Sequence, residues 1–285
     1  MADFYVTKAD GTSELFREGK LINSLINAGA KQDVAERIVD EVLACSITGV
    51  STSAIYKTAF RELRRLHRPT AARYSLRRAL FDLGPTGFPF EDFIGALYKK
   101  MGYKVKVRQI VPGKCITHEL DVVASNKEEC IAIEAKFHNN LGFKTNVKTA
   151  LYVQARMVDI FEKRIEDRAH CPVNKPLLLT NTKFTTNAIE YAECVGLNMI
   201  GWMYPKGQSL LDLIIKYEVY PITTLTTLSK SQKQSLIRKG IILCADLKEN
   251  KEAILSLGLS KTHIEEVLQE AYALGKMDYI KQKEA

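Results

Sequence analysis

The sequence predicts an α/β protein in which a mixed β-sheet flanked by helices lies between two mainly helical parts. Three observations predict this class. Apolar residues follow helical spacing near both ends of the 285-residue chain. Short aliphatic runs alternate with helical patterns in the middle. A cluster of turn-forming residues at 84–87 separates the first part from the second. We therefore expect three domains, at residues 1–84, 85–219 and 220–285.

Composition and charge limit the class of protein. The chain has 46% apolar residues, a net charge of +8 and a pI near 9.0, which favours a polyanionic partner. It contains no apolar run of about 18 residues and no charged-then-apolar leader, so we expect a soluble, cytoplasmic protein without a membrane partner. The six cysteines are scattered without a C-x-x-C pair. This pattern argues for free thiols in a reducing compartment and against a zinc site.

The first part begins with a strand pattern. Residues 4–16 alternate in hydrophobicity around Asp10-Gly11, a pair that favours a two-residue hairpin turn because both positions accept positive φ. Four helical patterns follow, and Pro69-Thr70 marks the start of the last one. They span residues 18–28, 31–46, 52–66 and 70–83. A short hairpin followed by a helical bundle is compact enough to fold by itself.

This part resembles the ATP-cone, the regulatory nucleotide-binding domain at the front of many ribonucleotide reductases and in their repressors. The matching motifs are Val6-x-Lys8-x-Asp10-Gly11, Glu14-x-Phe16-x-x-x-Lys20-Leu21, Val50-x-Thr52-x-x-Ile55 and Ala72-x-Tyr74-x-x-Arg77. The resemblance implies ATP or dATP as a ligand, with lysines on the phosphates and an apolar pocket around the base. The implied binding residues are Val6, Lys8, Lys20, Thr52 and Tyr56, with Arg77 or Arg78 adding a phosphate contact.

The role of this part has alternatives. No G-x-x-x-x-G-K-[ST] loop occurs in the chain, so we expect the nucleotide to act as a signal and not as fuel. The competing interpretation is a helical docking domain whose lysines are solvated. A basic run is either a solvated helix face or part of a DNA track, and the sequence leaves both open. It comprises Arg61, Arg64, Arg65, His67, Arg68, Arg73, Arg77 and Arg78.

The second part opens with a helix and a strand. Apolar residues at 90–101 follow helical spacing, and Gly102 is a natural C-terminal cap. Glu91 lies on the flank of this apolar stripe, where an ordinary exposed glutamate of a first helical turn is an alternative to a functional one. Residues 103–107 are predicted as the first strand of the sheet.

A charged hairpin follows, with strands at 118–124 and 130–138 that are otherwise aliphatic. Side chains of a strand alternate between faces, so Glu134 and Lys136 share one side, and Asp121 of the neighbouring strand can meet them there. Buried charges are expected where they are paired or bind an ion. Two carboxylates suit Mg²⁺ or Mn²⁺, which can polarise a phosphodiester while a lysine orients the attacking water. A surface hairpin with a Glu/Lys ladder is the alternative.

This hairpin resembles the PD-(D/E)xK nuclease superfamily, with Asp121, Glu134 and Lys136 at the three signature positions. Another segment resembles the first helix of the Mrr-like restriction endonucleases. It is Gly87-Phe88-Pro89-Phe90-Glu91-x-Phe93, followed by Met101-Gly102-Tyr103. The resemblance implies that Glu91 joins Asp121 and Glu134 as a metal ligand. It also implies that Gln154 contacts the substrate or the attacking water.

Other residues around this hairpin bear on the resemblance. Gln154 falls on a predicted helix at 146–162, but the companion aromatic residue four positions later is Val158 in this chain. His118 and His138 flank the strands and are interpreted as hydrogen-bonded neutral imidazoles outside the catalytic set. A strand at 175–181, a helix at 185–195 and a strand at 197–202 complete a mixed sheet with a parallel pair.

The third part is predicted as short helices at 222–240, 241–247, 251–257 and 260–274. Gly240, Gly258 and Gly275 separate or end them, which faintly resembles helix-hairpin-helix modules that bind the DNA backbone. A packing or dimerisation appendage is the alternative. We expect a homo-oligomer, although the number of subunits does not follow from the sequence.

Together these patterns predict a Mg²⁺-dependent DNA endonuclease that acts on duplex DNA and responds to ATP or dATP. Two other classes stay open. One is a nucleotide-responsive DNA-binding protein whose nuclease core no longer cuts. The other is a regulator of nucleotide metabolism, which would rest on the first part alone.

Overall fold

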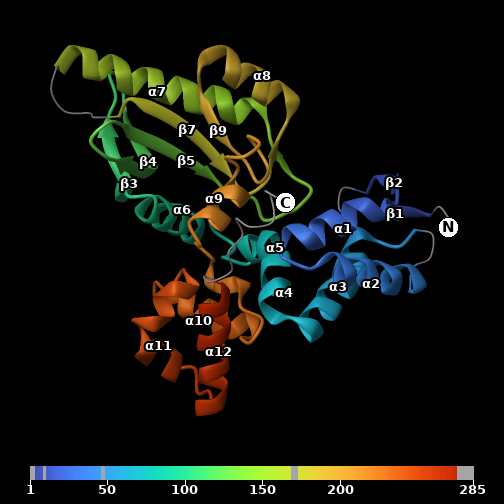
Figure 1. The fold of residues 1–285 in the computed structure, drawn as a ribbon. Coiled ribbons are helices and arrows are strands. Elements are labelled where there is room, and N and C mark those ends of the chain that lie inside the picture. The colour runs from blue at the N-terminus through green and yellow to red at the C-terminus, as the bar shows by residue number, and fades with distance from the viewer. Residues whose placement is uncertain (1–3, 9–10, 46–48, 168–172, 275–285) are drawn as a thin grey trace. The chain divides into compact units, whose positions relative to one another are not determined.

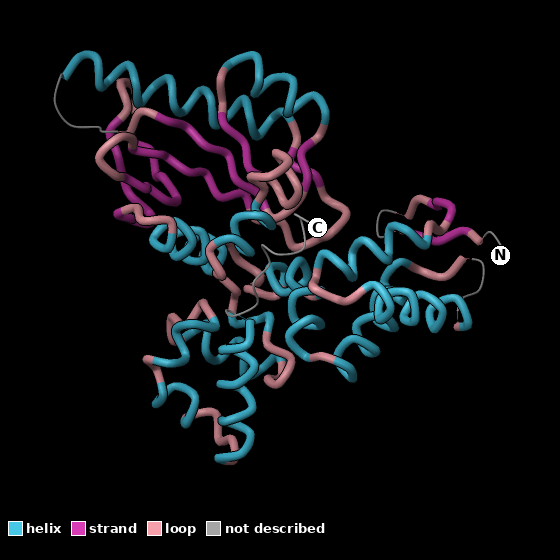
Figure 2. Tube along the Cα trace, viewed as in Figure 1, coloured by secondary structure: helices cyan, strands magenta, loops and turns pink. Residues whose placement is uncertain are grey.

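The computed structural model describes residues 4–8, 11–45, 49–167 and 173–274. The chain forms two compact units (Figure 1). One unit combines Met1–Leu80 with Tyr220–Ala285, and the other is Phe81–Val219. Figure 2 shows that most strands belong to the second unit. Among the described residues, none of the helices combines the length and apolar content needed to span a bilayer.

The second unit is built on a five-stranded mixed sheet of order β3-β4-β5-β7-β9. The first three strands are antiparallel, whereas β5, β7 and β9 run parallel. Their bounds are β3 Lys104–Pro112, β4 Thr117–Ser125, β5 Cys130–Lys136, β7 Lys175–Thr180 and β9 Asn198–Ile200. The predicted mixed sheet with a parallel pair is therefore confirmed. The first strand is longer than the predicted 103–107, because its pairing with β4 continues to Pro112.

Helices cover both faces of this sheet (Figure 1). They are α6 Phe88–Lys100, α7 Val147–Asp167, α8 Thr186–Val195 and α9 Leu210–Lys216. Buried side chains of α7 and α8, including Val153, Met157 and Ala188, form one core cluster with Ala132 and Leu178 of the sheet. Helix α6 contacts β3 and β4. A small parallel pair, β6 Lys144–Thr145 and β8 Lys183–Phe184, lies outside the main sheet.

The N-terminal part of the first unit is a short hairpin followed by helices. Its elements are β1 Tyr5–Thr7, β2 Ser13–Leu15, α1 Glu18–Asn27, α2 Gln32–Ala44, α3 Thr52–Leu66, α4 Arg68–Tyr74 and α5 Leu76–Phe81. The prediction of a two-residue turn is wrong, because the last strand pair is Thr7 with Ser13 and the Lys8 N–H donates to the Thr12 carbonyl. Gly11 has φ +81°. Asp10 itself lies outside the described residues.

The prediction of a single helix at 70–83 is also wrong, because the structure has two helices, α4 and α5, in this segment. The helical segment begins earlier, at Arg68, because the His67 ring accepts a hydrogen bond from the Thr70 N–H as an N-terminal cap. It breaks at Ser75, whose hydroxyl donates to the Ala72 carbonyl at 2.8 Å and so takes an acceptor that the helix would otherwise use. The predicted end of the second helix, Ser46, lies outside the described residues.

The C-terminal part of the first unit consists of η1 Ile222–Thr224, α10 Lys230–Arg238, η2 Cys244–Lys248, α11 Lys251–Leu255 and α12 Lys261–Leu274. The predicted helix at 222–240 is interrupted before α10. Buried Glu270 accepts hydrogen bonds from the N–H and hydroxyl groups of both Thr226 and Thr227, so these groups are satisfied outside a helix. Gly275 lies outside the described residues.

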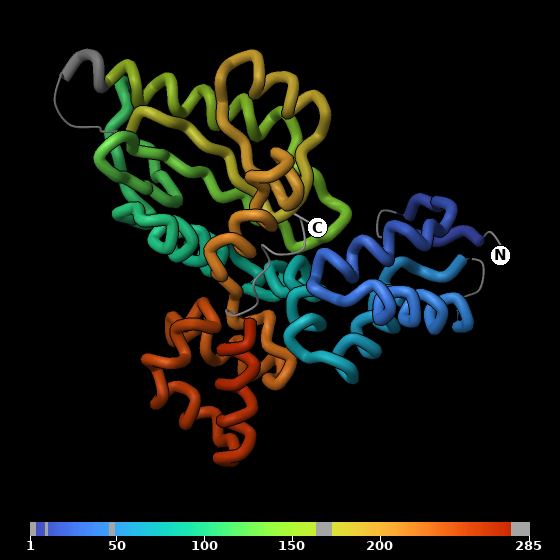
Figure 3. Tube along the Cα trace, in the orientation of Figure 1, coloured from blue at the N-terminus to red at the C-terminus, as the bar shows by residue number. Residues whose placement is uncertain are grey.

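Figure 3 shows the two parts of this unit, one near the blue end and the other at the red end of the chain. Arginines of the basic run join them. Arg64 donates to the Thr226 carbonyl at 3.1 Å, and Arg68 pairs with Glu266 at 3.2 Å. Arg73 donates to the Leu274 carbonyl at 3.0 Å. These contacts make the third part a packing partner of α3 and α4, and they occupy several guanidinium groups that the sequence offered as a DNA track or a solvated face.

Candidate active site

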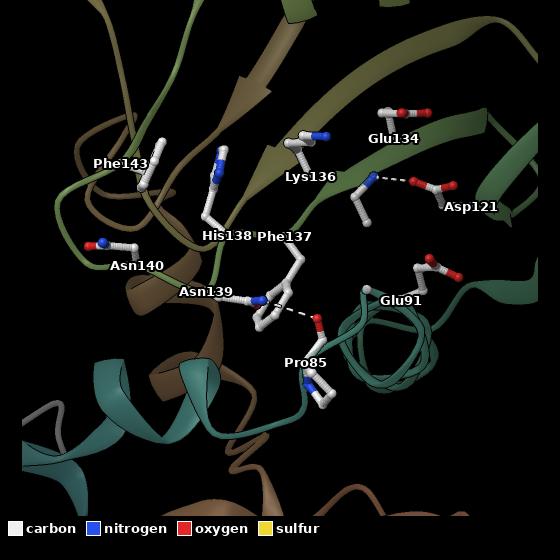
Figure 4. Close-up of a pocket in the computed structure, with 12 residues that line it drawn as sticks. Pro85, Glu91, Asp121, Glu134, Lys136, Phe137, His138, Asn139, Asn140 and Phe143 are labelled. Atoms are coloured by element: carbon white, nitrogen blue, oxygen red, sulfur yellow. Dashed lines mark hydrogen bonds between the residues drawn. The ribbon is translucent and has the colours of Figure 1, made fainter.

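A pocket of about 480 Å³ lies where β4, β5 and the start of α6 meet (Figure 4). Four of the five predicted catalytic residues line it: Glu91, Asp121, Glu134 and Lys136. The other lining residues are Pro85, Gly87, Ala135, Phe137, His138, Asn139, Asn140 and Phe143. The structure therefore brings together the charges that the alternation of the hairpin predicted on one side.

The hairpin register places Asp121 beside Glu134. Asn126 fixes the turn, because its side-chain oxygen accepts the N–H groups of Glu128 and Glu129, each at 2.8 Å. From there the strands pair up to Val122 and Ile133, one residue short of the two carboxylates. The Ala135 N–H then donates to Asp121 Oδ2 at 2.7 Å, which orients this carboxylate.

Glu91 enters the pocket from the first turn of α6. It is buried, with 8% of its surface exposed, so the alternative of an ordinary exposed glutamate is wrong. Its Oε2 accepts a hydrogen bond from Arg108 Nη1 at 3.1 Å, while Arg108 Nη2 bonds Asp92 at 2.8 Å. Gly87 leaves room for it: a Cβ there would lie 3.4 Å from Glu91 Oε1.

Burial and mutual repulsion disfavour the charged forms of these carboxylates. Burial, reinforced by the charge of Asp121 and opposed by Arg156, raises the pKa of Glu134 to about 7. Burial also raises the pKa of Asp121, although the hydrogen bond from the Ala135 N–H lowers it. Burial raises the pKa of Glu91 as well, although Arg108 lowers it. Such crowding favours a bound cation, which would relieve the repulsion.

A hard divalent cation fits this set of donors. Carboxylate oxygens on an open pocket suit Mg²⁺, which commonly uses one or two carboxylates and completes its shell with water and substrate phosphate. Within the described part of the chain, no three acidic, imidazole or thiol groups are arranged closely enough to hold a metal by themselves. Water or phosphate oxygens would therefore have to complete the coordination here.

Two arginines that the sequence did not single out form ion pairs with Glu134 and Glu91. Arg156 of α7 forms an ion pair with Glu134, and its Nη1 also donates to the Glu119 carbonyl at 3.0 Å. Its Nη2 donates to the Tyr152 hydroxyl at 2.7 Å. Arg108, the second arginine, has the left-handed φ of +50°. The only sequence signal for Arg156 is its spacing of four residues from Tyr152, which is common on helices.

The remaining predicted residues lie elsewhere. Gln154 is half-buried on α7 and does not line the pocket, so its catalytic role stays a prediction. His118 bonds Asp159 at 2.6 Å, and His138 bonds Thr145 Oγ1 at 2.9 Å. Both histidines thus have the hydrogen-bond partners that their interpretation required.

In the first unit, β1 lies beside the start of α3. The Thr7 N–H donates to the Val50 carbonyl at 3.0 Å, which brings buried Val6 near Thr52, the first residue of α3. Lys8 and Lys20 converge on one carboxylate oxygen of Glu14, at 2.8 and 3.2 Å. The Lys8 contact, aided by Lys20, lowers the pKa of Glu14.

An aromatic stack continues this region. The Tyr56 ring lies 5.1 Å from that of Tyr74 with nearly parallel planes, and burial raises the pKa of Tyr74. The Arg78 guanidinium lies 3.7 Å from the centre of the Tyr56 ring and donates to Ser53 Oγ at 3.2 Å. Burial lowers the pKa of Arg77. Arg78, one of the two arginines offered as phosphate contacts, therefore lies against Tyr56.

Each part of the chain is similar to a known protein family. Sequence profiles match the ATP cone domain at residues 4–82, a restriction endonuclease domain at 85–210 and the AF1548-like C-terminal domain at 220–274. An uncharacterized protein of Archaeoglobus fulgidus is 36% identical over 176 residues, which cover 61% of this chain and 95% of that protein. The chain belongs to the AF1548-like family. A crystal structure of the protein of unknown function AF1548 shares 33% identity with a TM-score of 0.54, covering 67% of this chain and 99% of that one.

This AF1548-like chain therefore joins an ATP-cone domain to an Mrr-type restriction endonuclease domain, as the resemblances predicted. The pocket lies inside the endonuclease match and the Lys8–Lys20–Glu14 cluster inside the ATP-cone match. Residues 220–274 match the family's own C-terminal profile, and their similarity to helix-hairpin-helix modules stays a prediction.

Proposed function

We propose that this chain is a Mg²⁺-dependent DNA endonuclease whose activity responds to ATP or dATP. The observation that carries the proposal is the meeting of Glu91, Asp121, Glu134 and Lys136 in one open pocket of the restriction endonuclease domain. The net charge of +8 supports a nucleic-acid substrate.

The pocket residues have distinct roles in this proposal. Asp121 and Glu134 would hold Mg²⁺ or Mn²⁺, with Glu91 supporting the same shell. The bound metal would polarise the phosphodiester and lower the pKa of a water molecule. The Ala135 N–H donates to Asp121 Oδ2 and so orients the carboxylate that would hold the cation.

Beside Arg108, which holds Glu91, the site has two positive groups, Lys136 and Arg156. The exposed Lys136 side chain lines the pocket, where its ammonium group can stabilise charge that develops on the phosphate and orient the water. Arg156 holds Glu134 in place from the side of α7. With Glu134 held by a cation, the Arg156 guanidinium could donate to a phosphate oxygen.

A plasmid-nicking assay tests this proposal. The purified chain should nick and linearise duplex DNA with Mg²⁺, and EDTA should abolish cleavage. Asp121→Ala and Lys136→Ala should fold normally and not cut. Their matched controls, Glu128→Ala and Lys127→Ala in the turn of the hairpin, replace exposed charges outside the pocket and should cut normally. Cleavage by Asp121→Ala or Lys136→Ala would reject the site.

One observation favours a second candidate, a DNA-binding protein that does not cut. Arg156 and Arg108 already neutralise Glu134 and Glu91, so the site can exist without a metal. In that case the chain would bind DNA with equal affinity with and without EDTA, and no divalent metal would yield nicked product.

The ATP-cone domain supports nucleotide control. Lys8 and Lys20 lie close enough together to share a carboxylate oxygen, and a nucleotide phosphate can replace that oxygen. We propose that ATP or dATP binding changes the cleavage rate or the number of subunits in a homo-oligomer. Identical cleavage rates and size-exclusion profiles with ATP, dATP and no nucleotide would contradict this coupling.

A further inference from the structure

The pocket has an aromatic end formed by His138 and Phe143. Their ring centroids lie 6.0 Å apart and their planes differ by 11°, so the rings are stacked with an offset. Figure 4 shows both side chains on the other side of Lys136 from Asp121 and Glu134. Phe143 is 61% exposed although it is a large apolar side chain. Exposure of a ring beside a charged site leaves one aromatic surface available to a ligand.

A buried polar network holds this aromatic end in place. Fully buried Asn181 accepts a hydrogen bond from the His138 N–H and donates one to the His138 carbonyl, both at 2.9 Å. The His138 ring bonds Thr145 Oγ1 at 2.9 Å, and Thr145 donates to buried Thr180 at 3.1 Å. Burying polar groups is costly unless they are paired, so this network fixes the His138 ring and with it the support for Phe143.

The chemistry of this end suits a planar, uncharged ligand. Burial, together with the charge of Lys136, lowers the pKa of His138 and so favours the neutral form of its ring. Phe143 adds a second ring without charge. Every nucleobase has a π-face that stacks on such a ring, and Lys136 lies in the same pocket to meet the adjoining phosphate.

We propose that Phe143, supported by His138, is a stacking subsite for an unpaired nucleobase next to the bond that is cut. This inference rests on the proposed function and adds to its duplex substrate a preference for sites with an unpaired or displaced nucleotide. In a regular duplex each base is stacked on both faces, so it must leave the stack before it can lie on Phe143. An unpaired base needs less unstacking and unpairing energy to leave the helix.

Binding measurements with Ca²⁺ in place of Mg²⁺ test the subsite without cleavage. The probes are a fully paired duplex and the same duplex with one unpaired 2-aminopurine. The wild-type chain should bind the second about 5- to 150-fold more tightly and quench its fluorescence, as base stacking on an aromatic ring predicts. Phe143→Leu keeps an apolar side chain but removes the ring, and should lose both effects. Phe143→Trp should retain them.

The controls separate this proposal from the endonuclease itself. Tyr272→Leu removes another exposed ring, on α12 in the other unit, and should bind both probes as the wild type does. A wild-type chain without preference, or a Phe143→Leu variant that keeps it, would overturn the subsite. A Phe143-dependent preference without cleavage in Mg²⁺ would support the subsite and reject the endonuclease. Cleavage in Mg²⁺ without that binding preference would support the endonuclease and reject the subsite.

Discussion

The two polar clusters of this chain are built in opposite ways. In the endonuclease domain, three carboxylates share a pocket, and burial raises the pKa of Glu134 to about 7. In the ATP-cone domain, two lysines share the carboxylate of Glu14, and the Lys8 contact lowers its pKa. The first arrangement has an excess of carboxylates, which supports the proposed cation site. The second has an excess of lysines, which supports the proposed binding of a nucleotide phosphate.

The largest expected effect comes from removing one acid of the first cluster. Glu134→Gln should weaken Mg²⁺ or Mn²⁺ binding by about 100-fold or more, since even residues that only support metal ligands contribute about 10- to 100-fold. Calorimetric titration of the metal in the absence of DNA measures this effect. Glu128→Gln, in the exposed turn of the same hairpin and outside the pocket, is the control. Unchanged metal affinity in Glu134→Gln would mean that this carboxylate serves Arg156 alone.

The second-largest expected effect comes from removing one lysine of the ATP-cone cluster. Lys20→Ala should weaken ATP or dATP binding by about tenfold, because a hydrogen bond to a charged group contributes about 1.5 kcal/mol. Lys31→Ala removes an exposed lysine that does not contact Glu14 and should bind nucleotide normally. Fluorescence titration with a labelled nucleotide compares the two variants. Equal affinities would leave Lys20 as a partner of Glu14 only.

A third prediction concerns pH. The pKa of Glu134 is raised from 4.5 to about 7, so the folded form binds this proton more tightly than the unfolded chain. The stabilisation is therefore complete below pH 4.5 and is lost as the pH rises through 7, by about 1 to 3 kcal/mol. Glu134→Gln should flatten this part of the pH profile in thermal unfolding. Added Mg²⁺ should do the same, because it binds the charged form. A wild-type profile without this slope would contradict the raised pKa.

The smallest effect tests the space around Glu91. Gly87 has φ −73° and ψ −24°, so alanine is tolerated by the backbone. Its Cβ would lie 3.4 Å from Glu91 Oε1, a contact that a small shift relieves. Gly87→Ala should change the free energy of unfolding by about 0.5 kcal/mol or less and leave metal affinity nearly unchanged. A tenfold loss of metal affinity would show that the Glu91 carboxylate cannot move at all.

The acidic cluster was predictable in part because strand geometry is simple. Alternation placed Glu134 and Lys136 together, and the hairpin brought Asp121 to them. Glu91 came from the resemblance, since its helix is remote from the hairpin. Arg156 was missed because its ion pair depends on how α7 rotates on the sheet, which periodicity does not define.

Other misses share a local cause. A side-chain hydrogen bond from Ser75 breaks a helix that apolar spacing predicts as continuous. The four hydrogen-bonding groups of Thr226 and Thr227 are satisfied by Glu270, more than forty residues away. Helical periodicity reports which faces are apolar, but it does not report where a polar side chain competes with the backbone.

The contacts of Arg64, Arg68 and Arg73 with residues 220–274 have a consequence for synthesis of the protein. One unit draws on both ends of the polypeptide, whereas the endonuclease domain is a continuous segment between them. As the chain leaves the ribosome, the middle segment emerges in full before the first unit has its last helices. Truncation after residue 219 would therefore expose the arginine-bearing side of α3 and α4 to water.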